Sequence, residues 1–224
     1  MTTGDAAARD PRAGGAGGAG GAGGDAAALE RCLAAGGVAV FPADTVYGLA
    51  CDPEDADAVA RLYELKGRPP RKPSAVMFFA LERALAALGD DLGPRTRALA
   101  ALLLPGAVSL LLPNPNRRFP LACGPDPATL GLRVPRLPAL AAVTRPALQS
   151  SANRAGEPDA RTLAQVPAAL RAGADLVLDG GELPGTPSTV IDLRRFERDG
   201  AYAIVRPGLL PEAVVARAAA QVVA

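Results

Sequence analysis

The sequence predicts a mixed α/β or α+β domain in which helices pack on one β-sheet. Short apolar runs, typical of buried strands, alternate along the chain with longer segments of helical spacing. Glycine and proline stand between many of these segments and mark where they end. At 224 residues, the chain is long enough to bury a substantial core in a single domain.

Helices are expected where apolar residues recur every three or four positions. In the first of them, Leu29 and Leu33 fall one turn apart, and Gly36-Gly37 end the segment. Pro105 stops the third helix, because the residue before a proline avoids the helical conformation. The expected helices cover residues 25–35, 54–66, 94–104, 160–171 and 211–222.

Strands are expected over the short apolar runs 38–41, 75–79, 108–112, 130–134, 146–150, 176–178, 189–193 and 202–205. After the first strand, Asp44 and Thr45 are expected at a strand-to-helix turn, where unpaired backbone N–H groups are available. Thr45 would offer a hydroxyl to a ligand there. An equal alternative is that Asp44 or Thr45 simply caps the helix.

Charge and composition exclude several classes of function. A net charge of +1 gives no field that draws the whole protein to nucleic acid or membrane, so RNA contact would need a local patch. The absence of histidine excludes imidazole-based metal sites and Ser-His or Cys-His triads. Cys32, Cys51 and Cys123 are far apart with no Cys-x-x-Cys pair, which favours reduced thiols in a cytosolic setting.

The ends of the chain carry no sign of membrane targeting. No run reaches the roughly 18 apolar residues of a membrane helix, and the N-terminus lacks the apolar region of a signal peptide. We therefore expect a cytoplasmic protein without a membrane partner. Residues 13–24 are only alanine and glycine, which predicts a disordered tail over residues 1–24 and a folded domain over residues 25–224.

Two triplets concentrate polar chemistry in this alanine- and leucine-rich chain. Lys66-Gly67-Arg68, held by the following Pro69-Pro70, offers two fixed positive charges to a polyanion. Ser151-Ala152-Asn153 offers a hydroxyl and an amide at the end of an expected strand. Each triplet alone has an ordinary alternative, a solvated face for the first and a turn for the second.

Two further cations have competing interpretations. Arg133 ends the apolar stretch Leu130-Gly131-Leu132, so it must find a partner or face a cleft. A structural salt bridge is the alternative. Lys72, held before Pro73, adds a third charge near the first triplet or is a solvated loop cation.

Several motifs in a fixed order resemble one family. The segment Phe41-Pro42-Ala43-Asp44-Thr45-Val46-Tyr47-Gly48-Leu49 resembles the signature of the YrdC-like, threonylcarbamoyl-AMP synthase family. The motifs that follow in that family's order are Tyr63 to Pro69, Lys72-Pro73, Pro105 to Ser109, Leu132 to Pro135, Ser150 to Asn153, Ser188 to Val190 and Arg206 to Gly208. The resemblance covers residues 30–215 and is closest to the short, single-domain members.

The resemblance implies a twisted, mostly parallel open sheet with helices packed on it and a concave, positively charged cavity. It also implies a reaction in which L-threonine, bicarbonate and ATP give threonylcarbamoyl-AMP and pyrophosphate. A separate threonylcarbamoyl transferase complex would then modify tRNA.

The resemblance further assigns roles to single residues of this sequence. Lys66 and Arg68 would be catalytic, stabilising charge as pyrophosphate leaves. Threonine would be bound by Thr45, Arg133 and Ser188. ATP would be bound by Lys66, Arg68, Lys72, Thr129, Ser151, Asn153 and Arg206. No carboxylate cluster suggests a metal site in the protein, so Mg²⁺ would arrive on the ATP phosphates.

Other functions stay open at this point. A module of the same fold could bind nucleotide or double-stranded RNA without synthase activity. A carbamoyl-transfer domain like that of hydrogenase maturation factors is a second alternative, although those are larger chains with zinc-binding cysteines. Relative to the family, Ser74, Met77 and a shortened 134–146 segment are departures that could alter the pocket.

Overall fold

The computed structural model of the protein describes residues 22–69 and 72–223. The predicted tail therefore lies outside the described residues, except for residues 22–24. Those three begin helix α1 (Ala22–Ala34), so the first helix starts three residues before the predicted boundary.

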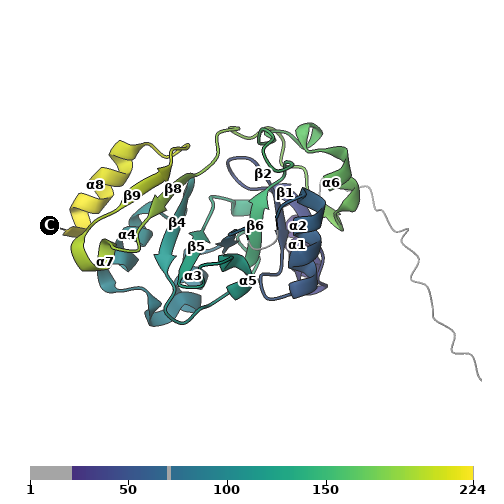
Figure 1. Ribbon diagram of the computed structural model, residues 1–224. Helices are drawn as coiled ribbons and strands as arrows, with labels where there is room; N and C mark the ends of the chain where they lie inside the picture. The colour runs from purple at the N-terminus through teal and green to yellow at the C-terminus, as the bar shows by residue number, and fades with distance from the viewer. Residues whose placement is uncertain (1–21, 70–71, 224) are drawn as a thin grey trace, which may run out of the picture.

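The described strands form one nine-stranded sheet in the order β7-β1-β2-β6-β3-β5-β4-β8-β9, with helices around it (Figure 1). Strands close in sequence are often far apart in this order, so the sheet joins the two halves of the chain. The strands are β1 (Ala39–Pro42), β2 (Tyr47–Cys51), β3 (Ala75–Met77), β4 (Val108–Pro113), β5 (Thr129–Arg133), β6 (Ala147–Ser151), β7 (Leu176–Val177), β8 (Thr189–Asp192) and β9 (Ala203–Arg206).

The sheet is mixed rather than mostly parallel. Three neighbouring pairs of described strands are parallel, namely β1 with β7, β3 with β5 and β4 with β8. The other five pairs are antiparallel. The α/β class and the open sheet are thus confirmed, but antiparallel pairs are the majority. The missed strand β2 is one reason, because both of its pairs are antiparallel.

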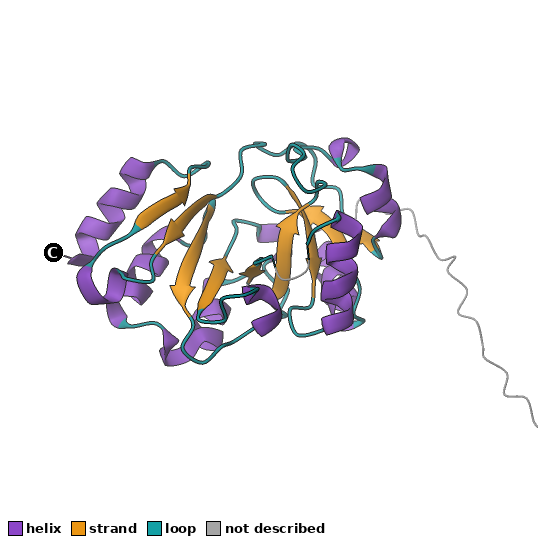
Figure 2. Ribbon diagram, viewed as in Figure 1, coloured by secondary structure: helices purple, strands orange, loops and turns teal. Residues whose placement is uncertain are grey.

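The helices lie around the sheet, most of them on the outside of the molecule (Figure 2). After α1 they are α2 (Ala56–Lys66), α3 (Leu81–Leu88), α4 (Pro94–Leu103), α5 (Pro120–Cys123), α6 (Ala168–Gly173), α7 (Phe196–Asp199) and α8 (Glu212–Val223). The helix predicted over 160–171 is instead a 3-10 turn, Leu163–Gln165, followed by α6. Pro167 separates the two, because its ring cannot continue a helix from the preceding turn.

Helix α2 places the first triplet. Its start is capped by Asp55, whose carboxylate accepts hydrogen bonds of 3.0 Å from the backbone of Asp57 and Ala58. Its end is set by Gly67, which has a φ of 60°, a conformation that suits glycine. Leu62 is buried in the core. The helix therefore ends with Lys66 directed at the sheet instead of at solvent.

The strand-to-helix turn predicted at Asp44 and Thr45 is wrong. The chain turns there into β2 instead, which pairs antiparallel with β1. Asp44 has a φ of 61°, a left-handed conformation that aspartate tolerates better than most side chains. The hydroxyl of Thr45 thus belongs to a tight turn between two strands, and neither residue caps a helix.

The two faces of the sheet differ in side-chain size. Leu148, Val76 and Leu132 pack into the larger apolar core on one face. On the other face, Gln149 of β6 is in register with Ala75 of β3, and Ala75 is in register with Gly131 of β5. Because side chains alternate along a strand, this second face carries small residues at its centre and leaves space above them.

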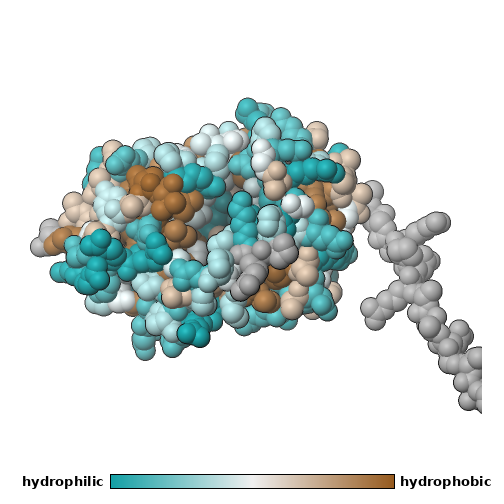
Figure 3. Space-filling view, in the orientation of Figure 1, coloured by the Kyte–Doolittle hydropathy of each residue, from teal (hydrophilic) through white to brown (hydrophobic). Residues whose placement is uncertain are grey.

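The surface carries one apolar region away from that space. Val205, Leu209 and Val214 are 58%, 39% and 42% exposed. In Figure 3, apolar colour gathers at the end of the molecule where Figure 1 places β9 and α8.

Within residues 22–69 and 72–223, no helix has the length and apolar character needed to cross a membrane.

Candidate functional site

A cavity of about 380 Å³ lies over the small-residue face of the sheet. Strands β3, β4, β5, β6, β8 and β9 all contribute to its lining, and Ala75 and Gly131 form part of its floor. Its charged lining residues are Arg68, Arg133, Arg206, Asp126 and Asp159. With three arginines and two aspartates, the lining side chains carry a net charge of +1. The predicted positive charge of the cavity therefore depends on a single side chain.

One row of residues crosses four strands under the cavity. Arg133 of β5 is in register with Ser109 of β4, Ser109 with Val190 of β8, and Val190 with Arg206 of β9. All four line the cavity. Adjacent strands are about 4.8 Å apart. The row therefore places Arg133 and Arg206 on opposite sides of a narrow floor formed by Ser109 and Val190.

Arg133 is held on the β1–β2 turn. Its Nη2 donates 2.7 Å hydrogen bonds to the carbonyl of Ala43 and to Oγ1 of Thr45, and it forms a 2.5 Å ion pair with Asp44. Arg133 is only 4% exposed, and burial lowers its pKa while the neighbouring Asp44 raises it. The two alternatives for Arg133 are therefore both correct: the side chain forms a salt bridge with Asp44, and it also lines the cavity.

The same guanidinium has an unsatisfied donor. Nε of Arg133 is buried and has no hydrogen-bond partner among the described residues. A buried donor without a partner is costly, and such groups in native proteins usually have a specific reason. A bound carboxylate would satisfy it, because a guanidinium can bind a carboxylate through two parallel hydrogen bonds.

Lys66 lies beside the second triplet. Its ammonium donates to Oδ1 and O of Asn153, at 2.6 and 2.9 Å, and to O and Oγ of Ser151. Lys66 is 4% exposed, so the alternative of a solvated face is wrong for this residue. Burial, together with the nearby positive charge of Arg68, lowers its pKa to about 8. The two triplets therefore form one hydrogen-bonded cluster.

Arg68 reaches the cavity beside that cluster. Its Nη1 donates a 3.0 Å hydrogen bond to Oγ of Ser150, and its Nη2 donates to the carbonyl of Pro73. The guanidinium also stacks 5.6 Å from the ring centroid of Tyr63, whose hydroxyl donates to the carbonyl of Lys72. Burial lowers the pKa of Arg68. Packing on Tyr63 fixes the cation in place before any ligand binds.

The hydroxyl groups at the far side of the cavity are linked to Arg206. Oγ of Ser188 is 3.0 Å from Oγ of Ser109, and Arg206 Nη2 donates a 2.7 Å hydrogen bond to the carbonyl of Ser188. Thr129, at the edge of the lining, donates a 2.6 Å hydrogen bond to Asp126. Each of these hydroxyls thus already has a protein partner near the cavity wall.

The predicted site residues fall into two sets. Arg68, Thr129, Arg133, Ser151, Ser188 and Arg206 line the cavity. Thr45, Lys66 and Asn153 are buried and support lining residues from behind. Lys72 is exposed and is not among the lining residues of the described chain, which fits its solvated alternative better.

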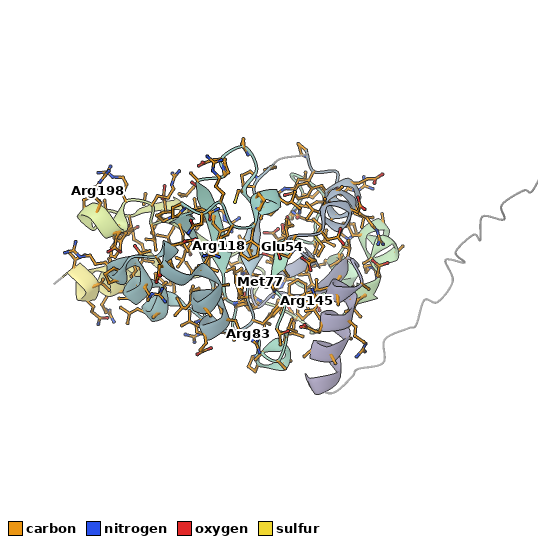
Figure 4. The ribbon with its side chains drawn as sticks, turned by 90° about the horizontal axis from the view of Figure 1, so that it is seen from below. Glu54, Met77, Arg83, Arg118, Arg145 and Arg198 are labelled. Atoms are coloured by element: carbon orange, nitrogen blue, oxygen red, sulfur yellow. The ribbon has the colours of Figure 1, made fainter. Side chains whose placement is uncertain are left out.

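Among the polar lining residues, Gln149, Asp126 and Asp159 were not singled out from the sequence, and Ser109 appeared there only as part of a motif. Gln149 had a usable signal, because it stands two residues before Ser151 on the same strand and therefore on the same face. Asp159 lies in a loop, and its position between the two cationic ends depends on the fold. Met77, a departure from the family, is fully buried at the centre of the molecule and is not among the lining residues (Figure 4).

The described part of the chain contains no group of three or more carboxylate, thiol or imidazole side chains placed to hold a metal ion. Of the two cavity aspartates, Asp126 accepts the hydroxyl of Thr129 and lies 3.8 Å from Arg194.

Known proteins share both the sequence and the fold. The family model Sua5_yciO_yrdC, described as telomere recombination, matches residues 31–208. The threonylcarbamoyl-AMP synthase of Xanthomonas campestris pv. campestris (strain B100) is 38% identical over 175 residues, covering 72% of this chain and 89% of the relative. The threonylcarbamoyl-AMP synthase of Chromohalobacter salexigens is 40% identical over 174 residues, covering 74% of this chain and 90% of the relative.

Two solved structures extend the comparison. The structure of P. abyssi Sua5 complexed with L-threonine superposes with a TM-score of 0.72 at 29% identity, covering 85% of this chain and 56% of that one. The present chain thus spans little more than half of that protein. E. coli YciO gives a TM-score of 0.70 at 26% identity, covering 84% of this chain and 91% of its own. With a family model matched over most of its length and relatives of this identity, the chain belongs to the Sua5/YciO/YrdC family.

Proposed function

We propose that this protein is a threonylcarbamoyl-AMP synthase, which converts L-threonine, bicarbonate and ATP into threonylcarbamoyl-AMP and pyrophosphate. The observation that carries the proposal is the cavity with different cationic groups at its two ends. Arg133 with the Thr45 turn stands at one end, and Arg68 with the Lys66 cluster stands at the other. Relatives that bear this activity in their names share 38–40% of the aligned residues.

The amino acid belongs at the Arg133 end. The guanidinium of Arg133, which lines the cavity, is suited to the α-carboxylate, and the hydroxyl of Ser188 is suited to the threonine hydroxyl. Thr45 lies behind Arg133 and holds it in place. Since these groups are already fixed by hydrogen bonds, little ordering remains to be done on binding.

The triphosphate belongs at the other end. Arg68 faces the cavity, and Lys66 stands behind Ser151 and Asn153. Arg206 lies on the opposite side, bound to Ser188, and is proposed to reach the nucleotide from there. Thr129, at the edge of the lining, is also proposed to bind ATP, whereas Lys72 is exposed and outside the lining. Fixed cations of this kind stabilise the charge that builds on the bridging oxygen as pyrophosphate leaves.

The reaction then follows in two steps. The amine of threonine joins the carbon of bicarbonate with loss of water, which gives a carbamate. A carbamate oxygen then bonds to the α-phosphorus of ATP as the bond to the β-phosphate oxygen breaks, and pyrophosphate takes that electron pair. Without histidine, the protein contributes mainly positioning and charge neutralisation. Mg²⁺, carried by the ATP phosphates, would neutralise phosphate charge, and Arg68 and Lys66 would orient the same phosphates.

The product would serve tRNA. We propose that a threonylcarbamoyl transferase complex takes it to tRNA in the cytoplasm. The test of the synthase itself is incubation with ATP, L-threonine and bicarbonate. Pyrophosphate release should require all three substrates, and the adenylate should appear by mass spectrometry. Release that continues without threonine or bicarbonate would contradict the proposal.

The alternative is a binding module of the same fold. Such a module would bind ATP or double-stranded RNA and give no threonine-dependent pyrophosphate. The second fixed cation, Arg133 beside the Thr45 turn, favours the synthase, because a nucleotide-binding module has no need for a carboxylate-binding group at the opposite end of the cavity.

A further inference from the structure

The side chain of Gln149 lines the cavity and has no hydrogen-bond partner among residues 22–69 and 72–223. It is only 6% exposed. Its neighbours in register on both adjacent strands are alanines, Ala50 and Ala75, which offer it no hydrogen bond. A primary amide carries two donors and one acceptor, so burying it unpaired costs free energy unless a ligand completes it.

The structure makes room for this amide. A Cβ placed on Gly48 would lie 2.8 Å from Nε2 of Gln149 and 3.3 Å from Cβ of Ala43. Any larger residue at Gly48 would therefore collide with the amide. The same geometry shows that the amide leans toward the β1–β2 turn, where Arg133 binds Ala43 and Thr45.

Gln149 also shares a strand with the other end of the cavity. It stands two residues before Ser151, which contacts the ammonium of Lys66. The amide thus lies between the end proposed for threonine and the end proposed for the phosphates. If these assignments hold, the ligand group that must occupy the space between is the carbamoyl unit that joins the amino acid to the α-phosphate.

We propose that the carboxamide of Gln149 binds the carbamoyl group of the reaction intermediate and product. In the cis form of its C–N bond, a carbamoyl group presents its N–H donor and its carbonyl acceptor on the same side. The side-chain amide offers the complementary acceptor and donor, so it can bind that form through a pair of hydrogen bonds. This inference rests on the proposed synthase function and adds to it a residue that recognises the one-carbon unit.

A different ligand group could use the same amide. Glutamine can pair with the N6 and N7 edge of adenine in the same two-bond manner. The two interpretations differ in which substrate depends on Gln149, and that difference can be measured.

The experiment uses Gln149→Met, which keeps length and removes both hydrogen bonds, and Gln149→Glu, which keeps shape and replaces the donor with an anion. Gln221→Glu, on the exposed surface of α8, is the matched control. Each variant is melted first and then assayed for KM and kcat with each substrate. Affinities for AMP, for threonine and for threonylcarbamoyl-AMP are measured by calorimetry.

We expect KM for bicarbonate to rise about tenfold in Gln149→Met and further in Gln149→Glu. The reason is that the bound one-carbon unit loses its hydrogen-bond partner in the site. Affinity for threonylcarbamoyl-AMP should fall by a similar factor, while affinities for AMP and threonine stay within about twofold. Gln149→Met provides the test even where the buried acid of Gln149→Glu hinders folding.

Two outcomes would overturn the inference. Weaker AMP binding with an unchanged KM for bicarbonate would assign the amide to adenine. Unchanged constants in both variants of an active parent would show that the amide binds no ligand. A parent that releases no pyrophosphate in the presence of all three substrates would instead overturn the proposed function itself.

Discussion

Lys66 Nζ donates a 2.6 Å hydrogen bond to Oδ1 of Asn153, which ties the end of α2 to the loop after β6. Oγ of Ser151 donates to the same oxygen at 2.7 Å, and Nδ2 of Asn153 donates to the carbonyl of Glu157. The lysine therefore has a structural task as well as the proposed catalytic one. Its replacement should affect both folding and turnover.

We predict that Lys66→Ala lowers stability by about 1–3 kcal/mol, because the buried oxygens of Ser151 and Asn153 lose a charged donor. In a chain of this size each kcal/mol shifts Tm by about 2–4 °C. Threonine-dependent pyrophosphate release should fall a hundredfold or more even at temperatures where the variant is fully folded. Glu64→Ala, an exposed position on the same helix, is the control and should change neither quantity. A fully active Lys66→Ala at low temperature would limit Lys66 to a structural role.

The lowered pKa of Lys66 predicts opposite pH trends for activity and stability. Burial sets this pKa near 8, against 10.5 for a free lysine, so the unfolded chain binds more protons between those values. The free energy of unfolding contributed by Lys66 should therefore rise with pH from about 8 to 10.5. If the ammonium is needed for catalysis, kcat/KM should fall as the pH rises through the same range. Lys66→Arg should move the alkaline limb of the kcat/KM profile to higher pH, whereas an unmoved limb would assign it to another group.

Substrate choice tests the Arg133 end of the cavity. If Arg133, held by Thr45, binds the carboxylate while Ser188 binds the hydroxyl, serine should react poorly and valine more poorly still. A site built to hydrogen-bond a hydroxyl strongly rejects an analogue that lacks it, because the site's own polar atoms are left unpaired. Pyrophosphate release with each amino acid at equal concentration measures the preference. Equal rates for threonine and valine would remove the assignment.

Gly208 tests the backbone that carries Ser188. A Cβ at this position would lie 2.4 Å from the carbonyl oxygen of Pro187 and 2.5 Å from the backbone nitrogen of Thr189. Gly208→Ala should therefore displace Ser188, lower stability by about 1–3 kcal/mol and raise KM for threonine. Gly24→Ala is the opposite case, because nothing lies within 4 Å of its Cβ and α1 favours alanine over glycine. Thermal melts of both variants check the pair, and equal Tm values would contradict the packing argument.

Much of the fold could be predicted because strands and helices here have clear apolar periodicity. Strand β2 was missed, since the residues after Thr45 were interpreted only as part of a motif and the turn itself is very short. Helix α3 was missed as well. The order of strands was beyond reach, because it depends on pairings such as that of β2 with β6, which are far apart in the sequence.

The site shows the same division. The residue types of both triplets pointed to phosphate chemistry, and the structure brings the triplets together. The burial of Lys66 was not predictable, because its acceptors lie 85 and 87 residues further along the chain. The face of Gln149 follows from its spacing to Ser151, but the alanines beside it on both neighbouring strands depend on long-range pairing.

The position of β6 has a consequence for biosynthesis. This strand lies between β2 and β3, so the hairpin of β1 and β2 has no neighbour on that side until residues 147–151 have left the ribosome. Until then the nascent chain exposes an unpaired strand edge, which is prone to pairing with other chains. Slowing translation before residues 147–151 have emerged from the ribosome should thus lengthen the period in which the growing protein depends on chaperones.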